Sequence, residues 1–302
     1  MNETALTDFD EAELAVVRRA FARQMMAVAN VHDERIERAF ASVRREDFLG
    51  PEPWQLVIRP QPFTLPRNDP ACIYQDVVIA LAPERGVNNG SPSLHVKMLH
   101  DLAVEPGQHV AQIGAGTGYY TAMLAELVGR DGRVTAYEVD AALAARARDN
   151  LAARRNVVVV NADGARTPTE LVDRIYVNFG VAAPAASWID HLAPNGKLLF
   201  SLGVPHPDLR ARFPRHAAQG AALLVECRAN GLAARWLYPA YYVCAEGELA
   251  GDADSELALH AAFERGGIEF IKSLRWREPI DVTRCWYAAK HWGLSYDPLD
   301  EV

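Results

Sequence analysis

A glycine-rich turn between a short apolar run and a helix-like run constrains most strongly how this chain folds. The stretch HVAQIGAGTGYYTAMLAELVG, residues 109–129, has glycines at positions 114, 116 and 118. Glycine lacks a Cβ atom, so such a turn lets the backbone approach another group closely. The run before the turn has the length of a strand, and the run after it has apolar residues at helical spacing. We therefore predict a strand over 109–114 and a helix over 119–129.

Strand-like and helix-like runs alternate beyond this turn. The further strands are predicted at 133–140, 156–164, 173–180 and 196–203, and the helices at 141–153 and 186–194. Such alternation predicts an α/β fold of Rossmann-like architecture, in which a mostly parallel sheet has helices on both faces. Two β-rich runs that meet at Asn230-Gly231 predict a C-terminal antiparallel hairpin.

Three segments are expected along the chain. Residues 1–75 are predicted to form an N-terminal helical and wrapping segment, with amphipathic helices at 11–29 and 33–43. Residues 76–247 form the core, and residues 248–302 form an extension rich in aromatic residues. Because so many aromatic side chains are costly to leave in water, we expect the extension to pack onto the core or onto a second subunit.

Composition narrows the possible partners and location. The net charge of −8 disfavours binding to nucleic acid or to anionic membranes. The chain has no run of eighteen apolar residues, so no membrane span is predicted. Its four cysteines are widely spaced, which disfavours a disulfide framework or a metal site. The N-terminus is acidic and lacks a signal-like apolar run, so a cytoplasmic protein is expected, with its oligomeric state open.

Acidic residues end the two strands that follow the glycine turn. Glu138 ends the second strand, where a carboxylate suits the two hydroxyls of a ribose. Asp163 ends the third strand, where it can accept a hydrogen bond from an adenine amino group. Tyr119 stands where a dinucleotide fold has its last glycine, which disfavours a pyrophosphate cradle.

Together these features describe an adenosine site, the pattern of Rossmann-like methyltransferases that use S-adenosyl-L-methionine and release S-adenosyl-L-homocysteine. The alternative is that Glu138 and Asp163 cap the helices that follow them. The residues expected to line this site are Gly114, Ala115, Gly116, Gly118, Glu138, Val139, Ala162, Asp163 and Gly164.

Three stretches carry a closer resemblance: ERIERAFASVRREDFLGPE, IYQDVVIAL and VNNGSPSLHVKMLHDL. Over about residues 12–247 the chain resembles protein-L-isoaspartate O-methyltransferases, whose phrase T-I-S-x-P-x-M-x falls on residues 88–95. The resemblance implies that the chain methylates a carboxylate of a protein or peptide. It also implies that the cofactor faces Val87, Asn88, Asn89, Gly90 and His95; for His95, the alternative is a solvated helix residue.

The chain departs from the family pattern at two positions before the glycine turn, and again after the fourth strand, where residues 177–184 stand in place of a short T-A-A phrase. Gly90 stands where the family has a serine close to the reacting carboxylate, and Gln112 stands where an acidic residue is usual before the glycine turn. Cofactor binding is expected to survive these changes, whereas isoaspartyl specificity is open. Gly90→Ser is expected to raise isoaspartyl turnover unless residue 90 has a positive φ.

The residues also bear on the reaction. A carboxylate is ionised at neutral pH and needs no general base, and the sequence after the fourth strand shows no acidic cluster suited to Mg²⁺. Carboxyl O-methylation without a metal is therefore expected, with Ser91 as the candidate catalytic residue that holds the acceptor carboxylate. The alternative for Ser91 is N-capping of a helix at 91–104.

Three rival functions stay open. The first is a related methyltransferase with a changed peptide or small-molecule substrate. The second is an RNA methyltransferase, which the acidic composition disfavours. The third is a protein that binds the cofactor without catalysis, for which the changes at Gly90 and Gln112 are the only support.

Overall fold

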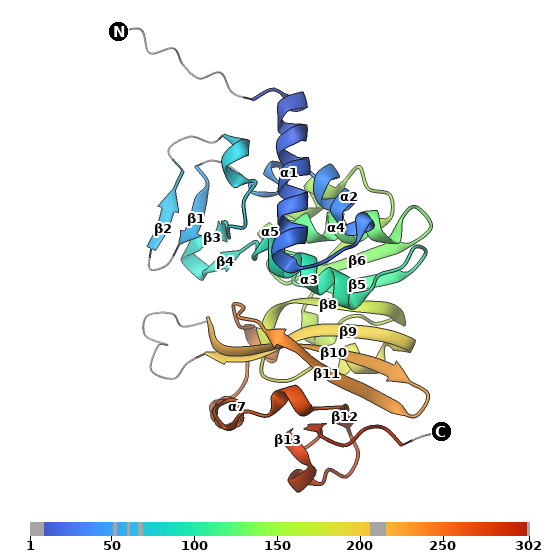
Figure 1. Cartoon of the computed structure of the whole chain (residues 1–302). Coiled ribbons are helices and arrows are strands. Elements are labelled where there is room, and N and C mark those ends of the chain that lie inside the picture. The colour runs from blue at the N-terminus through green and yellow to red at the C-terminus, as the bar shows by residue number, and fades with distance from the viewer. Residues whose placement is uncertain (1–8, 51–52, 59–60, 66–68, 206–215, 301–302) are drawn as a thin grey trace.

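The computed structural model describes residues 9–50, 53–58, 61–65, 69–205 and 216–300, with one large sheet at its centre (Figure 1). The parallel strands are β5 (His109–Ile113), β6 (Arg133–Glu138), β7 (Val157–Asn161), β8 (Val172–Val181) and β9 (Leu192–Pro205). The antiparallel strands are β10 (Ala217–Arg228), β11 (Gly231–Pro239), β12 (Ser273–Trp276), β13 (Cys285–Ala288) and β14 (Trp292–Ser295). Their order is β13-β14-β12-β11-β10-β9-β8-β5-β6-β7. The predicted α/β class is confirmed.

Helices cover both faces of the sheet because successive strand residues point to opposite sides. One face packs against α1 (Glu11–Ala29), α2 (Glu34–Ser42), α3 (Pro92–Leu102), α4 (Tyr119–Val128) and α5 (Ala141–Leu151). The other face packs against α6 (Ala186–Asp190) and α7 (Ala253–Arg265). Tyr176 belongs to the first core, and its neighbour Ile175 belongs to the second.

The helices begin largely where the sequence predicts. Asp33 accepts hydrogen bonds from the backbone of Arg35 and Ile36 and caps α2, and the hairpin at Asn230-Gly231 is present between β10 and β11. The helix predicted at 186–194 is too long, because β9 already begins at Leu192. No helix in the described ranges is long and apolar enough to span a membrane.

A small wrapping unit lies beside the large sheet. It contains β1 (Gln55–Ile58), β2 (Gln61–Thr64), β3 (Ala80–Ala82) and β4 (Val87–Asn88). Arg45, which is fully buried, donates hydrogen bonds to the carbonyls of Ile73, Gln75 and Val77. These bonds hold the chain that leads into β3 against the helical layer.

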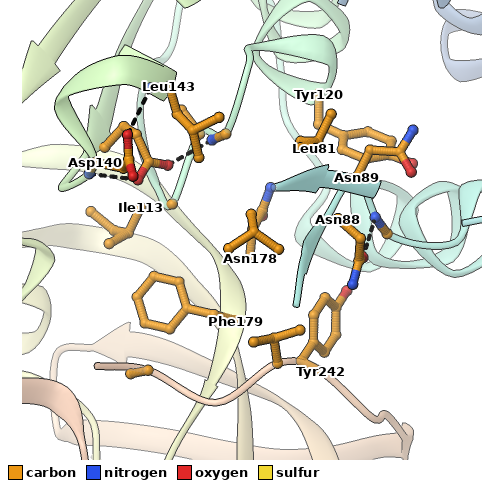
Figure 2. A pocket seen from close by; sticks show the side chains of 18 of the residues that line it. Leu81, Asn88, Asn89, Ile113, Tyr120, Asp140, Leu143, Asn178, Phe179 and Tyr242 are labelled. Carbon is orange, nitrogen blue, oxygen red and sulfur yellow. Dashed lines mark hydrogen bonds between the residues drawn. The ribbon is translucent and has the colours of Figure 1, made fainter. Parts of the chain in front are cut away.

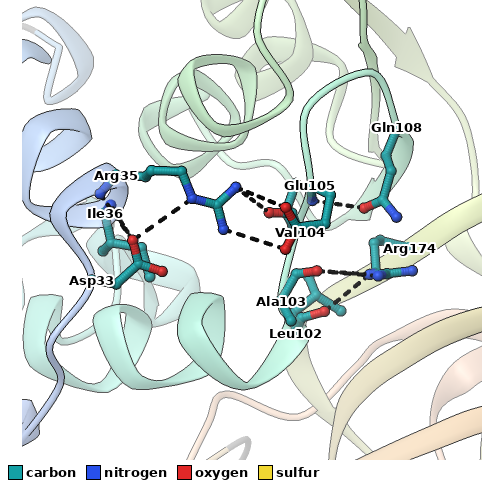
Figure 3. Close-up of polar contacts among 9 residues, drawn as sticks. All are labelled: Asp33, Arg35, Ile36, Leu102, Ala103, Val104, Glu105, Gln108 and Arg174. Carbon is teal, nitrogen blue, oxygen red and sulfur yellow. Dashed lines mark hydrogen bonds and ion pairs between the residues drawn. The ribbon is translucent and has the colours of Figure 1, made fainter.

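Two arginines fix the turn between α3 and β5 (Figure 3). Arg35 of α2 donates to the carbonyl of Val104 at 3.0 Å and lies beside Glu105. Arg174 of β8 is buried and donates to the carbonyls of Leu102 and Ala103 at the end of α3. The C-terminal end of α3 is therefore tied both to α2 and to the sheet.

The extension from residue 248 continues the same sheet. Strand β12 pairs with β11 through Leu232↔Leu274. Helix α7 packs against β9 on the face of the sheet that α6 also covers. Trp286, Tyr287 and Trp292 are buried within this chain, so the expected packing onto the core is confirmed for them. The division of the chain after residues 75 and 247 stays a proposal. The large sheet contains strands from both sides of the second boundary, so residues 248–302 do not form a separate sheet.

We expect Trp286→Ala to lower the free energy of unfolding by about 3–5 kcal/mol, because truncating a buried aromatic side chain leaves a cavity. The indole is fully buried against Phe263 and Tyr287, with ring centroids 5.2 and 6.2 Å away. The matched control is Val282→Ala in the same extension, where the side chain is 66% exposed. Denaturant unfolding that gives the two variants equal stability would contradict this packing role.

Candidate functional site

A cavity of about 310 Å³ opens at the carboxyl ends of the parallel strands. Figure 2 shows Ile113, Asn178, Phe179 and Tyr242 around it. In open α/β sheets, ligands bind at this edge, next to the point where the order of the strands reverses. The volume of the cavity suits a small ligand. Of the residues predicted from the sequence, those that line the cavity are Val87, Asn88, Asn89, Gly90, Ser91, His95, Gly114, Ala115, Gly116, Glu138, Val139, Ala162, Asp163 and Gly164.

The glycine turn after β5 forms one wall of the cavity. Gly114 and Gly116 have φ of +78° and +57°, a region that other residues rarely adopt. A Cβ atom on Gly114 would lie 2.6 Å from the ring of Phe179. Gly118 does not line the cavity: a Cβ there would lie 2.6 Å from Leu151, so this glycine lets α4 pack closely on α5.

Glu138 at the end of β6 is buried beneath this turn. Its Oε2 accepts the N–H of Gly116 at 2.7 Å, and its Oε1 accepts the N–H of Asp140 at 3.0 Å. Burial raises the pKa of the Glu138 carboxyl. Asp140, not Glu138, caps α5, so the capping alternative for Glu138 is wrong. Each carboxylate oxygen keeps a lone pair for a ligand hydroxyl.

Asp163 follows β7 at the start of a short 3₁₀ turn, Gly164–Arg166. Its Oδ1 accepts the N–H of Ala165 at 2.9 Å, so the capping alternative holds for that oxygen. The residue also lines the cavity, where the other oxygen of the carboxylate is available to a ligand amino group.

Ser91 precedes α3, but its hydroxyl does not cap the helix. The hydroxyl donates to Asp76 at 2.9 Å, and Asp76 also accepts the backbone N–H of Ser93 at 3.1 Å. Asp76 thus takes the capping role that the sequence suggested for Ser91. A substrate carboxylate at the Ser91 hydroxyl would have to approach this anion, which is electrostatically unfavourable.

His95 faces the cavity from α3 and is 2% exposed, so the alternative of a solvated residue is wrong. Its ring stacks on Tyr120 with centroids 3.5 Å apart, and its Nδ1 lies 2.5 Å from the hydroxyl of Tyr176. Burial lowers the pKa of His95 to about 3, so the imidazole is neutral at physiological pH.

Gly90 and His95 fit each other closely. Gly90 has φ of +71°, and a Cβ atom there would lie 2.3 Å from Nε2 of His95. The backbone N–H of Gly90 donates to Asn88, while the Asn89 side chain accepts from Ile79. These bonds hold the loop in the conformation that only glycine adopts easily at residue 90.

Sequence reasoning missed the wall made by the chain after β11. The backbone N–H of Ala245 donates to the carbonyl of Gly180 at 2.8 Å, which holds Tyr242 against the cavity. Arg85 forms ion pairs with Asp140 and with Glu246, and so joins this wall to the first turn of α5. No local pattern signals contacts between positions so far apart in the sequence.

Gln112 lies outside the cavity. It is fully buried beneath the glycine turn, where its Oε1 accepts a hydrogen bond from the Thr121 hydroxyl at 2.6 Å. Within the described residues, no cluster of three or more His, Cys, Asp or Glu side chains has the arrangement of a metal site.

The strand order and the site define the class of protein. A glycine turn after the central strand β5, an acidic residue at the end of the adjacent strand β6, and a cavity at their carboxyl ends are features of class I methyltransferases. The family model for protein-L-isoaspartate(D-aspartate) O-methyltransferase matches residues 18–219, about two thirds of the chain. The chain therefore belongs to the protein-L-isoaspartate O-methyltransferase family.

Curated relatives with this name agree. The Aeropyrum pernix protein is 31% identical over 202 residues, a match that covers 65% of this chain and 69% of the relative. The Methanopyrus kandleri protein is 37% identical over 127 residues, a match that covers 40% of this chain and 56% of the relative. The chain thus spans little more than half of the second relative's length.

Solved structures support the fold. One described as a protein-L-isoaspartate O-methyltransferase has a TM-score of 0.63 at 22% identity, and the match covers 82% of this chain and 69% of that chain. A putative enzyme of the same name from Plasmodium falciparum, in complex with S-adenosyl-L-homocysteine, has a TM-score of 0.58 at 16% identity, covering 76% and 98%. At these identities the likeness shows the fold alone.

We expect Glu138→Gln to weaken binding of S-adenosyl-L-homocysteine by about 1.5–3 kcal/mol at pH 7.5, the worth of a hydrogen bond to a charged group. Because burial raises the pKa of Glu138 and ribose hydroxyls bind its ionised form best, wild-type affinity should fall as the pH is lowered through that pKa. The glutamine variant should show a flatter pH profile.

Calorimetry between pH 7.5 and pH 5 measures both effects. Glu170→Gln is the matched control, since Glu170 is half-exposed and does not line the cavity. Equal affinities of wild type and Glu138→Gln across this range would remove Glu138 from the binding site.

Proposed function

We propose that this protein transfers the methyl group of S-adenosyl-L-methionine to a free carboxylate of a protein or peptide, that of an isoaspartyl residue. Family membership supports the reaction and the acceptor, and the buried Glu138 carboxylate hydrogen-bonded to Gly116 in the wall of the cavity is the observation that supports the cofactor site. The acceptor oxygen attacks the methyl carbon, and the carbon–sulfur bond breaks with its electron pair left on sulfur. The products are a methyl ester and S-adenosyl-L-homocysteine.

The cavity suggests how the cofactor lies. In this proposal Glu138 accepts the ribose hydroxyls, and Asp163 accepts the adenine amino group. The backbone of Gly114–Gly116 lies along the ligand, where the positive φ values of the glycines leave the approach open. Val139, Ala162, Gly164 and the loop Val87–Gly90 also line the cavity, and in this proposal the first three contact the adenine and the loop contacts the methionine part of the cofactor.

The reaction depends on the position of the acceptor carboxylate and not on proton transfer. A carboxylate is already ionised at neutral pH, so no base has to be supplied. Alignment of the nucleophile, the methyl carbon and the sulfur is the main source of rate acceleration, and it lowers the activation barrier by up to about 7–11 kcal/mol when the orientation is ideal. The stacked and hydrogen-bonded side chains around His95 form a rigid wall suited to that purpose.

We also propose that the protein acts in the cytoplasm as a protein-modifying enzyme. The four cysteines, Cys72, Cys227, Cys244 and Cys285, form no disulfides, which fits a reducing compartment.

The experiment uses methyl-labelled S-adenosyl-L-methionine with a peptide that contains one isoaspartyl residue and with the matched aspartyl peptide. We expect label on the isoaspartyl peptide alone, and we expect mild base to release it as methanol, because the product is an ester. Base-stable label, or label accepted only by RNA or by small molecules, would refute the proposal and select one of the rival functions. Binding of the cofactor without turnover on any acceptor would select the non-catalytic protein.

We expect Gly90→Ser to lower this activity by about tenfold or more, in place of the gain that the sequence suggested. A non-glycine residue with positive φ costs about 1–3 kcal/mol, and the new Cβ would displace His95 from a position 2.3 Å away. Gly107→Ser is the matched control, because Gly107 has φ of +85° but nothing within 4 Å of an added Cβ. A rise in turnover for Gly90→Ser would show that the loop adapts to a side chain.

A further inference from the structure

His95 is held in one orientation by its neighbours. Tyr120 stacks on its ring with an interplanar angle of 11°, and Tyr176 and Tyr242 contact it edge-on with centroids 5.9 and 6.1 Å away. The Nδ1 atom bonds to the Tyr176 hydroxyl at 2.5 Å. Rotation of the imidazole would break this bond and the stacking together, so the ring is fixed.

The same contacts decide which nitrogen bears the proton. Among the described residues, the Tyr176 hydroxyl has two hydrogen-bonding partners, Nδ1 of His95 at 2.5 Å and the sulfur of Met98 at 3.8 Å. A thioether is a weak acceptor, and this sulfur already accepts from the Tyr242 hydroxyl at 2.8 Å. The Tyr176 phenol therefore donates to Nδ1. Since a neutral imidazole has a single N–H, that proton lies on Nε2.

The Nε2 atom faces the gap left by Gly90. It makes no hydrogen bond to any described residue, and the position of a Cβ on residue 90 would lie 2.3 Å from it. Both residues line the cavity. The lack of a side chain at residue 90 thus leaves a fixed N–H donor directed at the space beside the loop.

We propose that the Nε2–H of His95 donates a hydrogen bond to the carboxylate that receives the methyl group, and so takes the part that a residue-90 side chain would otherwise play. This inference rests on the proposed function. One carboxylate oxygen accepts from His95, while the other attacks the methyl carbon and the sulfur keeps the electron pair. No proton is transferred, and the sulfonium and carboxylate charges cancel as the ester forms.

Ser91 is a weaker candidate for this part. Its hydroxyl already donates to Asp76, an exposed carboxylate that would repel a second one. Among the described residues, the side chains in ring contact with His95 are the neutral phenols of Tyr120, Tyr176 and Tyr242. The acceptor is therefore expected on the Gly90 side of the loop.

The test compares His95→Leu, which has no donor, with His95→Gln, whose carboxamide restores an N–H near the position of Nε2. We expect His95→Leu to lower kcat/KM for an isoaspartyl peptide by about ten- to a hundred-fold, the equivalent of one hydrogen bond to a charged group. His95→Gln should recover part of this loss. Affinity for S-adenosyl-L-homocysteine, measured by calorimetry, reports separately on the cofactor contact that the resemblance implies for His95, and the loss of kcat/KM in His95→Leu should exceed any loss of that affinity.

Tyr176→Phe tests the tautomer of His95, which a role in packing alone would not change. It keeps the ring but removes the donor to Nδ1, so ¹⁵N NMR should show the Nε2–H form in the wild type and a mixture of tautomers in the variant. Turnover should fall while cofactor affinity is retained.

The outcomes separate the two levels of inference. A wild type that binds S-adenosyl-L-homocysteine but forms no base-labile ester would overturn the proposed function. Wild-type turnover that His95→Leu retains, or a loss that matches its loss of cofactor affinity, would overturn only the role of His95.

Discussion

The hydrogen bond between the Gly116 backbone and the Glu138 carboxylate joins the ends of two neighbouring parallel strands. Strand β5 pairs with β6 in parallel, so their carboxyl ends meet at one edge of the sheet. The turn that follows β5 has to reverse the chain into α4 within a few residues, and glycines supply the positive φ angles that this reversal needs. A buried carboxylate that accepts two backbone N–H groups fixes the turn in that shape. The corner that this bond fixes forms one wall of the cavity.

The opposite wall depends on contacts from outside the parallel sheet. Arg45 fixes the chain at residues 73–77 by three hydrogen bonds to carbonyls, and Asp76 in that same chain segment binds the first turn of α3. Helix α3 presents His95 to the cavity. The N-terminal helical layer therefore helps to position His95 indirectly, through residues 73–77 and Asp76. The site thus depends on the N-terminal layer and on the wall after β11 as well as on the glycine turn.

Local patterns in the sequence predicted strands β5 to β11, the glycine turn and the two acidic strand ends, because each depends on residues close together in the chain. The short strands of the wrapping unit and of the extension were not predicted. The fit between Gly90 and His95 was not predicted, since a positive φ and a side-chain clash across five positions leave no periodic signal. The role of Asp76 at α3 was missed for the same reason: Ser91 has the usual residue type for a cap, and only the tertiary structure shows another acceptor in its place. Arg85, which bridges Asp140 and Glu246, joins positions that no sequence window contains.

The pairing of β11 with β12 also changes what the sheet offers to other proteins. Without the residues beyond 248, the nine-residue strand β11 would be an edge strand with a row of unpaired backbone groups, a template for unwanted association. The extension pairs with the first part of that strand, through Leu232↔Leu274 and Ala233↔Ser273. The sheet then ends at β13, a strand of four residues whose register with β14 is interrupted by a bulge. Short and irregular edges are poor partners for strand addition. The segment that looks like an appendage in the sequence therefore shortens the row of unpaired backbone groups on β11 that could pair with another chain.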